Sequence, residues 1–344
     1  MKKALIIFLI LTAFGCNNKN ENIDTLFISK RYLSSERYLS IPKVLAPIEI
    51  FANKKGNIFI TEHQEDKFAA FIDNNGVLFR FCPIGRGPGE NIPPSFFSRS
   101  KREESVGFYS PRSQKYHEYK LAPKDSVKTK LIKEINGFSN ASKLLCINDS
   151  VFFAIAASIN SLNRYELYDK NGDFINSNIE YPENGSQKIP DELKPIAYQS
   201  NISYNSKHNI IISACLYVEH IELLSIKSGE IERKFVLHTS DGTFDNTSSS
   251  NFNSIKPDKN NVMSYLCLDA GEDYFYVLYS GRNTKKYSRQ EAFLGNTILK
   301  FDYTGKPIEK LILDNDILSF SVSKGNLYAI GLNSNEPVIL KYKL

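Results

Sequence analysis

Short runs of Ile, Val, Phe and Tyr, separated by Gly, Asn, Asp and Ser, follow one another along most of the chain, and helical periodicity is almost absent. Apolar runs bounded in this way by turn residues are typical of β-strands. One pattern recurs six times: an apolar strand, a short polar turn, and a second strand that is strongly apolar or aromatic. Its copies lie at residues 48–63, 96–111, 142–158, 200–215, 264–281 and 319–332. The pattern predicts an all-β protein made of repeats.

A second hairpin with the turn Asp-x-x-Gly follows most copies of the first. It occupies residues 71–81, 167–179 and 300–313, and residues 223–237 carry a variant with Ile226 in place of the aspartate. Asp opens such a turn, and glycine accepts the positive φ angle that closes the hairpin. Two hairpins make one four-stranded unit. Six units predict a six-bladed β-propeller of four-stranded antiparallel blades.

The last repeat lacks a fourth strand after residues 338–343, while residues 24–33 belong to no repeat. An open blade would leave a row of unpaired backbone groups at a sheet edge. We therefore expect the N-terminal segment 24–33 to supply the missing strand and close the ring. The propeller domain is predicted to span residues 24–344.

The N-terminus has the composition of an export signal. Two lysines precede an apolar run at residues 4–14, which is too short to span a bilayer, and Gly15 stands directly before Cys16. We expect a signal peptide over residues 1–15, lipidation of Cys16, and a polar lipidated tether over residues 16–23. An ordinary signal peptide with a chance cysteine is the alternative.

Charge and cysteine spacing exclude several classes of function. The formal net charge of the whole chain is +5, which is too small to indicate nucleic-acid binding. The sequence contains no Cys-x-x-Cys pair and no two histidines at the spacing of a metal site. It also lacks the Gly-x-Ser-x-Gly motif of serine hydrolases. The sequence thus predicts no cofactor, no resident metal and no catalytic residue. We expect the cysteines beyond position 16 to be buried thiols rather than disulfides: Cys82, Cys146, Cys215 and Cys267.

The loop Gly-Arg-Gly-Pro-Gly-Glu at residues 85–90 is the most specific candidate for a binding site. Its glycines can aim backbone N–H groups at an anion, and Arg86 can clamp a carboxylate or phosphate. The alternative is an inter-blade turn in which Arg86 and Glu90 pair locally.

The long connections offer a second set of candidate residues. In an up-and-down propeller, the connections at residues 182–198, 239–263 and 281–296 all lie on one face, together with the loop at residues 85–90. Long loops on a rigid scaffold commonly carry binding sites, so we predict that this is the working face. The third connection is basic, which favours an acidic partner or an anionic glycan. Its candidate ligand-binding residues are Arg282, Lys285, Lys286 and Arg289.

The stretch FIDNNGVLFRFCPIGRGPGE, residues 71–90, joins an Asp-x-x-Gly hairpin to a Gly-x-Gly-Pro-Gly-Glu loop. In this it resembles the first blade of TolB-like six-bladed propeller lipoproteins of the Bacteroidetes type. The residues before Cys16, which have the form of a lipoprotein cleavage site, agree with that group. The length of the chain and the six repeats agree with it as well. The resemblance implies a propeller fold and a lipid anchor. It implies little about function, because propellers host binding modules and enzymes alike.

We expect a non-enzymatic ligand- or protein-binding propeller in the cell envelope, held to a membrane by the N-terminal lipid. We favour the periplasmic side over the cell surface. An envelope protein or an anionic glycan is the expected partner, and nucleic acid is not. The alternative is a propeller hydrolase or lyase with a divalent metal in the central channel. Its candidate ligands lie near first-to-second-strand turns: Asn148, Asp149, Asp269 and Asp273.

Overall fold

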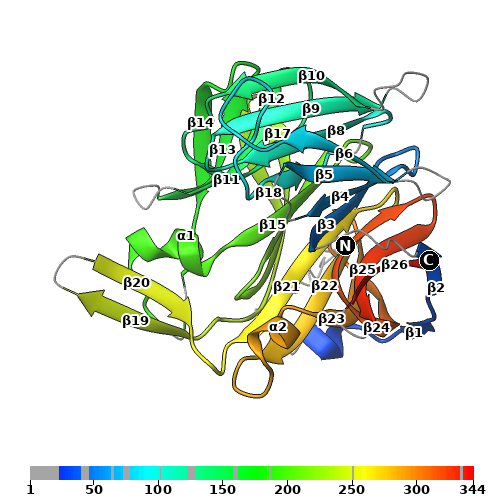
Figure 1. The fold of residues 1–344 in the computed structure, drawn as a ribbon. Coiled ribbons are helices and arrows are strands. Elements are labelled where there is room, and N and C mark those ends of the chain that lie inside the picture. Colours follow the sequence, from blue (N-terminus) through cyan, green and yellow to red (C-terminus); the bar gives the residue numbers. More distant parts are fainter. Residues whose placement is uncertain are drawn as a thin grey trace, which may run out of the picture.

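The structure is a computed structural model. The residues that it describes are 23–39, 46–62, 66–72, 78–100, 102–121, 129–157, 162–183, 185, 187–249, 252–333 and 336–344. Cys16 and the predicted signal peptide lie outside these residues. Within them most residues lie in strands (Figure 1). The helical elements are short: η1 (Ile23–Leu26), η2 (Asp191–Leu193), α1 (Lys194–Ala197) and α2 (Arg289–Ala292).

Four separate antiparallel sheets of four strands form the first four blades. Blade 1 contains β3 (Pro47–Ala52), β4 (Ile58–Glu62), β5 (Lys67–Ile72) and β6 (Leu78–Pro83). Blade 2 contains β7 (Phe96–Ser98), β8 (Ser105–Ser110), β9 (Lys115–Leu121) and β10 (Thr129–Asn136). Blade 3 contains β11 (Ala141–Cys146), β12 (Val151–Ala156), β13 (Asn163–Asp169) and β14 (Phe174–Glu180). Blade 4 contains β15 (Ser200–Asn205), β16 (Ile210–Cys215), β17 (Glu219–Lys227) and β18 (Glu230–Ser240).

Blades 5 and 6 share one long strand. Their elements are β21 (Val262–Ala270), β22 (Tyr274–Asn283), β23 (Gly295–Asp302), β24 (Pro307–Ser323), β25 (Asn326–Asn333) and β26 (Glu336–Lys343). The first part of β24 pairs with β23 as the outer strand of blade 5, and its second part pairs with β25 as the inner strand of blade 6. The prediction of six four-stranded blades is therefore confirmed.

An N-terminal strand completes blade 6, as expected, but it is a later segment than predicted. The closing strand is β2 (Glu36–Leu39), which pairs antiparallel with β26. The segment 24–33 instead contributes β1 (Lys30–Leu33), which runs parallel to β24 on the outer edge of blade 5. The assignment to 24–33 was wrong because Ile23 and Phe27 are buried in the apolar layer shared by blades 4 and 5, which holds this segment at the outer rim.

The Asp-x-x-Gly turns form as predicted where the structure describes them. In the turn at residues 169–172, Asp169 Oδ1 accepts hydrogen bonds from the Asn171 and Asp173 amides at 2.8 and 2.9 Å, and Gly172 has φ +85°. Gly305 takes the same role with φ +90°. The corresponding turn in blade 1 falls at residues 73–77, outside the described residues.

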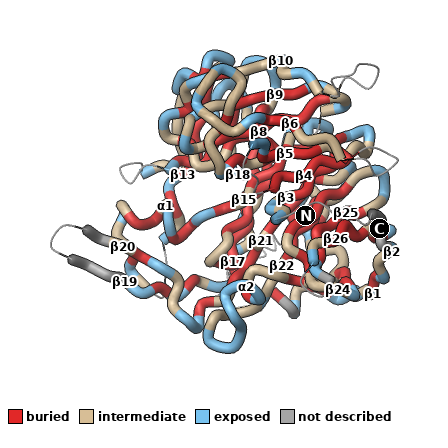
Figure 2. The backbone as a smooth tube through the Cα atoms, viewed as in Figure 1, coloured by how far each residue is buried: buried red, intermediate tan, exposed pale blue. Residues whose placement is uncertain are grey.

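Buried residues follow the strands of the ring (Figure 2), and most of them are aromatic or aliphatic. Phe108 is fully buried, and its ring centroid lies 5.0 Å from that of Phe97 and 5.5 Å from that of Phe68 in blade 1. Such contacts bury large apolar areas on both sheet faces. The expectation for the thiols is confirmed, since all four cysteines after position 16 are free and buried: Cys82, Cys146, Cys215 and Cys267.

Two of the long connections fold together into one projection, which we call the insertion platform. It consists of η2, α1, β19 (Phe244–Ser249) and β20 (Phe252–Pro257), and its hairpin extends away from the ring in Figure 1. Tyr181, Leu193, Phe244 and Ile255 are buried together beneath it. Within the described part of the chain, no helix has the length and apolar character needed to cross a membrane.

Candidate functional site

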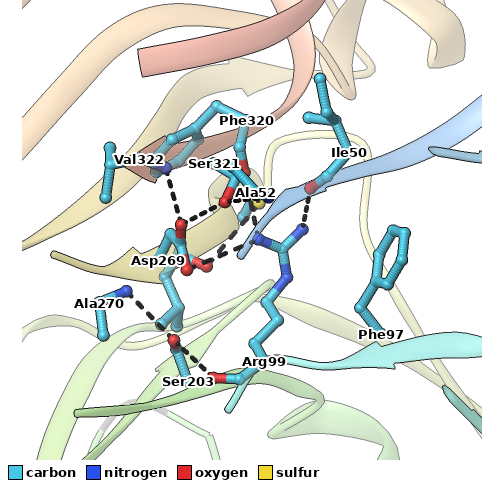
Figure 3. A network of polar contacts seen from close by, with 12 residues as sticks. Ile50, Ala52, Phe97, Arg99, Ser203, Asp269, Ala270, Phe320, Ser321 and Val322 are labelled. Carbon is cyan, nitrogen blue, oxygen red and sulfur yellow. Dashed lines mark hydrogen bonds and ion pairs between the residues drawn. The ribbon is translucent and has the colours of Figure 1, made fainter. Parts of the chain in front are cut away.

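The axis of the ring is occupied by Arg99, which directly follows the inner strand of blade 2 (Figure 3). Its side chain is 5% exposed. Nη1 donates to the Phe320 carbonyl of blade 6, and Nη2 donates to the Ile50 carbonyl of blade 1, both at 3.1 Å. The carbonyl of Arg99 accepts from the Tyr204 amide at 3.1 Å and from Ser203 Oγ at 3.2 Å, both in blade 4. One residue thus links four blades across the centre.

Asp269 on the inner strand of blade 5 completes this axial network. Its carboxylate is fully buried and lies 4.0 Å from Arg99 Nη1. Asp269 Oδ2 accepts from Ser321 Oγ at 2.5 Å and from the Val322 amide at 2.7 Å, both in blade 6 (Figure 3). The buried guanidinium of Arg99 therefore donates hydrogen bonds to carbonyl oxygens and lies near a carboxylate. These partners give it a structural role.

The residues named for a channel metal are not brought together. Asp269 belongs to the axial network, Asp149 pairs with Arg102 at 3.2 Å, and Asp273 pairs with Lys207 at 2.9 Å. Asn148 uses its side-chain oxygen to cap its own turn. Among the described residues there is no group of three or more His, Cys, Asp or Glu side chains arranged for a metal ion. The channel-metal interpretation therefore has no ligand set in this part of the chain.

The loop at residues 85–90 is an inter-blade turn, and the amides of its glycines are hydrogen-bonded within the protein. Glu90 folds back so that its Oε2 accepts from the Gly87 amide at 2.8 Å. The Gly89 amide donates to Glu134 Oε2 at 2.7 Å. A side chain at Gly85 would displace the Glu90 carboxylate from its place in the loop. Arg86 is exposed, and its predicted role toward a ligand stays a prediction.

Of the four basic candidate residues in blade 5, one makes contacts that fix the local structure and three are exposed. Arg282 pairs with Asp316 at 2.7 Å and donates to the Glu291 carbonyl at 3.0 Å, so it fixes the α2 connection. Lys285 is exposed and donates to Asn260 Oδ1 at 3.1 Å. Lys286 and Arg289 are also exposed, and the ligand-binding role predicted for all four stays a prediction.

The opposite face carries a cavity of about 670 Å³ beside the axis, which we call the mouth cavity. Turns between the first and second strands of blades 1, 4, 5 and 6 line it. Lys207 is paired with Asp273, whereas Lys54, Lys300 and Lys324 have no carboxylate within ion-pair distance among the described residues. Lys300 lies over the Tyr274 ring, 4.1 Å from its centroid.

A second hollow of about 580 Å³ lies on the same face over blades 1–4. It shares Lys54, Tyr204 and Ser206 with the mouth cavity, and a hydrogen bond of 3.4 Å from Lys54 Nζ to Ser206 Oγ crosses between them. Its charges are balanced, because Arg102 and Lys120 face several carboxylates. The unpaired positive charge of this face is therefore concentrated in the mouth cavity.

Sequence reasoning missed the mouth lysines because they are far apart in the sequence, in separate turns and in β23. A signal was present: the first-to-second-strand turns of blades 1, 4 and 6 each contain lysine, at Lys54, Lys207 and Lys324. The blade repeat places equivalent turns at one end of the axis. Recurring lysines at one repeat position therefore indicate a basic mouth.

Comparisons with known proteins agree with this architecture. Residues 77–325 match the family model described as TolB-like 6-blade propeller-like. A member of the DUF4221 family from Bacteroides vulgatus superimposes with a TM-score of 0.53 and 12% identity, covering 92% of this chain and 94% of that one. A candidate exported protein of Bacteroides fragilis gives a TM-score of 0.52 and 14% identity, covering 94% and 96%. No curated protein matches. Since the family model covers well over half of the sequence, the chain belongs to the TolB-like six-bladed propeller family.

Proposed function

We propose that this protein is a lipid-anchored binding module of the cell envelope and that it holds an anionic glycan in the mouth cavity. The observation that carries the proposal is the set of three lysines, Lys54, Lys300 and Lys324, that share one cavity without a carboxylate partner in the described residues. Lysines that outnumber the carboxylates around a hollow favour a ligand that brings negative charge.

The size and lining of the mouth cavity suit a short acidic sugar. Its volume of about 670 Å³ falls in the range typical of small-molecule sites. Tyr274 is half-buried on its wall, and the Lys300 ammonium lies over its ring. Lysine ammonium groups bind carboxylates and sulfates as point charges and need no fixed orientation.

A binding role is also supported by the axial network. Arg99 and Asp269 fill the central position where a propeller enzyme with a channel metal would hold that metal. Their polar atoms make hydrogen bonds that link the blades. The rigid ring then acts as a scaffold that presents its turns and loops. Envelope location is inferred from the signal-like N-terminus with Cys16, and the structural neighbour from Bacteroides fragilis is itself a candidate exported protein. We infer periplasmic exposure rather than display on the cell surface.

The long-loop face is the competing location for the ligand. Lys285, Lys286 and Arg289 are exposed there next to the folded α2 connection, and Arg86 is exposed on the same face. The two locations differ in which lysines should contribute to ligand affinity. They can therefore be separated with one pair of matched variants.

The test is calorimetric titration of the mature protein with short oligogalacturonates and with their methyl esters. We expect the free acids to bind and the esters to bind far more weakly, because esterification removes the charge. Lys54→Gln/Lys324→Gln should weaken binding by about fivefold or more, whereas Lys285→Gln/Lys286→Gln removes the same charge and should leave it unchanged. The opposite ranking would place the site on the long-loop face, and equal binding of acid and ester would contradict an anionic ligand.

A further inference from the structure

The two most exposed large hydrophobic side chains in the described part of the chain lie close together, in the N-terminal segment. Ile28 is 102% exposed and Tyr32 is 72% exposed. Tyr32 lies on β1, at the outer edge of blade 5. The neighbouring Phe27 and Leu33 are buried in the propeller, so the segment is fixed while Ile28 and Tyr32 stay in solvent. An apolar pair that a folded segment keeps in solvent offers a contact surface to a partner.

Basic side chains accompany this pair. Lys30 is exposed, and its ammonium lies 5.0 Å from the centroid of the Tyr32 ring. In the parallel pairing of β1 with β24, Lys310 is the register partner of Lys30 and Ile312 is that of Tyr32, and both partners are partly exposed. We call this surface the rim patch. It consists of Ile28, Lys30, Tyr32, Lys310 and Ile312.

The charge of the rim patch suits an anionic partner. Lys30 has no carboxylate within ion-pair distance in the part of the chain that the structure describes. Glu309, next to the patch on β24, is engaged by Arg31 through two hydrogen bonds of 3.0 Å. Apolar side chains flanked by lysines match the interface of a bilayer, where acyl chains lie directly below charged headgroups.

The proposed lipid anchor brings a bilayer to this side of the ring. Cys16 precedes Ile23 by seven residues, and an extended chain spans at most about 3.6 Å per residue, so the anchored end stays within about 25 Å of Ile23. Ile23 is buried in the apolar layer shared by blades 4 and 5. A tether this short keeps the membrane beside these blades, where the rim patch lies.

We propose that the rim patch rests on the surface of the anchoring membrane, with Ile28 and Tyr32 at the level of the headgroups and the lysines against anionic phospholipids. The proposal rests on the lipid anchor at Cys16 proposed above. Tyrosine suits this position because its ring is apolar while its hydroxyl stays in water. The lysine stems cover apolar surface in the same way and keep their ammonium groups among the headgroups.

Contact through the rim sets the orientation of the ring. The mouth cavity and the long-loop face lie at the two ends of the axis, whereas β1 lies on the circumference. Neither end is therefore covered by the bilayer, and a ligand reaches the mouth cavity along the membrane surface.

The absence of tryptophan from the sequence allows a direct test. Tyr32→Trp introduces a single such fluorophore at the rim patch. Phe174→Trp is the matched control, because Phe174 is a 59% exposed aromatic residue on β14, and β1 and β14 lie on opposite sides of the ring (Figure 1). The mature chain without lipid is coupled through Cys16 to maleimide lipids in vesicles of 3:1 phosphatidylcholine and phosphatidylglycerol. The four propeller cysteines are buried and do not compete.

We expect brominated lipids to quench the emission of Tyr32→Trp and to leave that of Phe174→Trp unchanged. Ile28→Ser in the Tyr32→Trp chain should reduce the quenching. Lys30→Gln in the same chain should lower the equilibrium constant for contact, taken from the quenched and unquenched lifetime components, by about fivefold. Lys170→Gln, at an exposed turn of blade 3, removes the same charge and should leave it unchanged.

The chemical coupling replaces the native lipid, so the result does not depend on whether the cell lipidates Cys16. If Tyr32→Trp is quenched no more than Phe174→Trp, the rim patch does not contact the bilayer and the proposal is overturned. It is also overturned if neutral vesicles of phosphatidylcholine alone quench Tyr32→Trp as strongly. Either result leaves the anchor itself standing, because labelling at Cys16 tests it separately.

Discussion

At the residue scale, Arg99 shows how one side chain closes the axis of the propeller. Its guanidinium reaches main-chain oxygens of blades 1 and 6, and its carbonyl receives two donors from blade 4. Removing a guanidinium from water is costly, and hydrogen bonds to Phe320 and Ile50 together with the Asp269 carboxylate offset that cost. The network therefore fixes the relative position of inner strands that are far apart in the sequence.

Arg99→Met should lower the free energy of unfolding by about 3–5 kcal/mol, because it leaves the Asp269 carboxylate buried without its cation. Denaturation in guanidinium chloride measures the change. Arg282→Met is the control: it breaks a partly exposed pair with Asp316 and should cost less than about 1 kcal/mol. Arg99→Met/Asp269→Asn should recover part of the loss. A cost for Arg99→Met no larger than that of the control would contradict the structural role of the axial network.

At the element scale, β24 and the N-terminal strands hold blades 5 and 6 together. The 17 residues of β24 pass from the outer edge of one blade to the inner edge of the next without a loop. Arg31 on β1 makes two hydrogen bonds of 3.0 Å to Glu309 on β24, and β2 closes the edge of β26. The N-terminal segment is thus bound to two blades at once.

Stepwise deletion from the N-terminus should separate the contributions of these strands. In a mature chain, removal of residues 17–22 should leave the melting temperature unchanged. Removal of residues 17–33, which takes away η1 and β1, should lower it, and removal of residues 17–39, which also takes away β2, should lower it by at least about 6 °C. The reasons are the loss of Ile23 and Phe27 from the core and the opening of a sheet edge. If the proteins that lack residues 17–33 and 17–39 have the same melting temperature, β2 does not hold the ring closed.

At the scale of the whole molecule, the two faces of the ring are built differently. Short turns surround the axis on one face and leave the mouth cavity open between them. On the other face, the long connections fold into the insertion platform, which has its own buried cluster and borders a cavity lined by His220 and His238. The two faces therefore carry hollows of different chemistry on one rigid support.

The proposed lipid anchor gives a prediction for the whole protein in the cell. Cys16→Ser should move it from the membrane fraction to the soluble fraction and abolish labelling by a palmitate analogue, because lipid is attached to that thiol. Cys267→Ser is the matched control: Cys267 is a free, buried thiol of the propeller, and its loss should leave the label in place. Label that persists in Cys16→Ser would contradict the anchor.

The sequence by itself determined what depends on local chemistry. Alternating apolar runs and turns such as the one at residues 169–172 set the strands and hairpins, and their repetition gave the number of blades. The loop at residues 85–90 was visible as a motif, yet the partner of its Gly89 amide was not, because Glu134 comes from another blade.

Only the tertiary structure decided which residues meet. The closing strand is β2 rather than β1, because the burial of Ile23 and Phe27 sets where the chain enters the ring. Arg99 reaches the axis only when all inner strands surround it, and the mouth lysines converge only when the blades do. The Nδ1 atoms of His220 and His238 face each other because of the register of β17 and β18, which includes a shift beside His220. Pairing, register and closure depend on contacts between distant segments, and a local pattern does not contain that information.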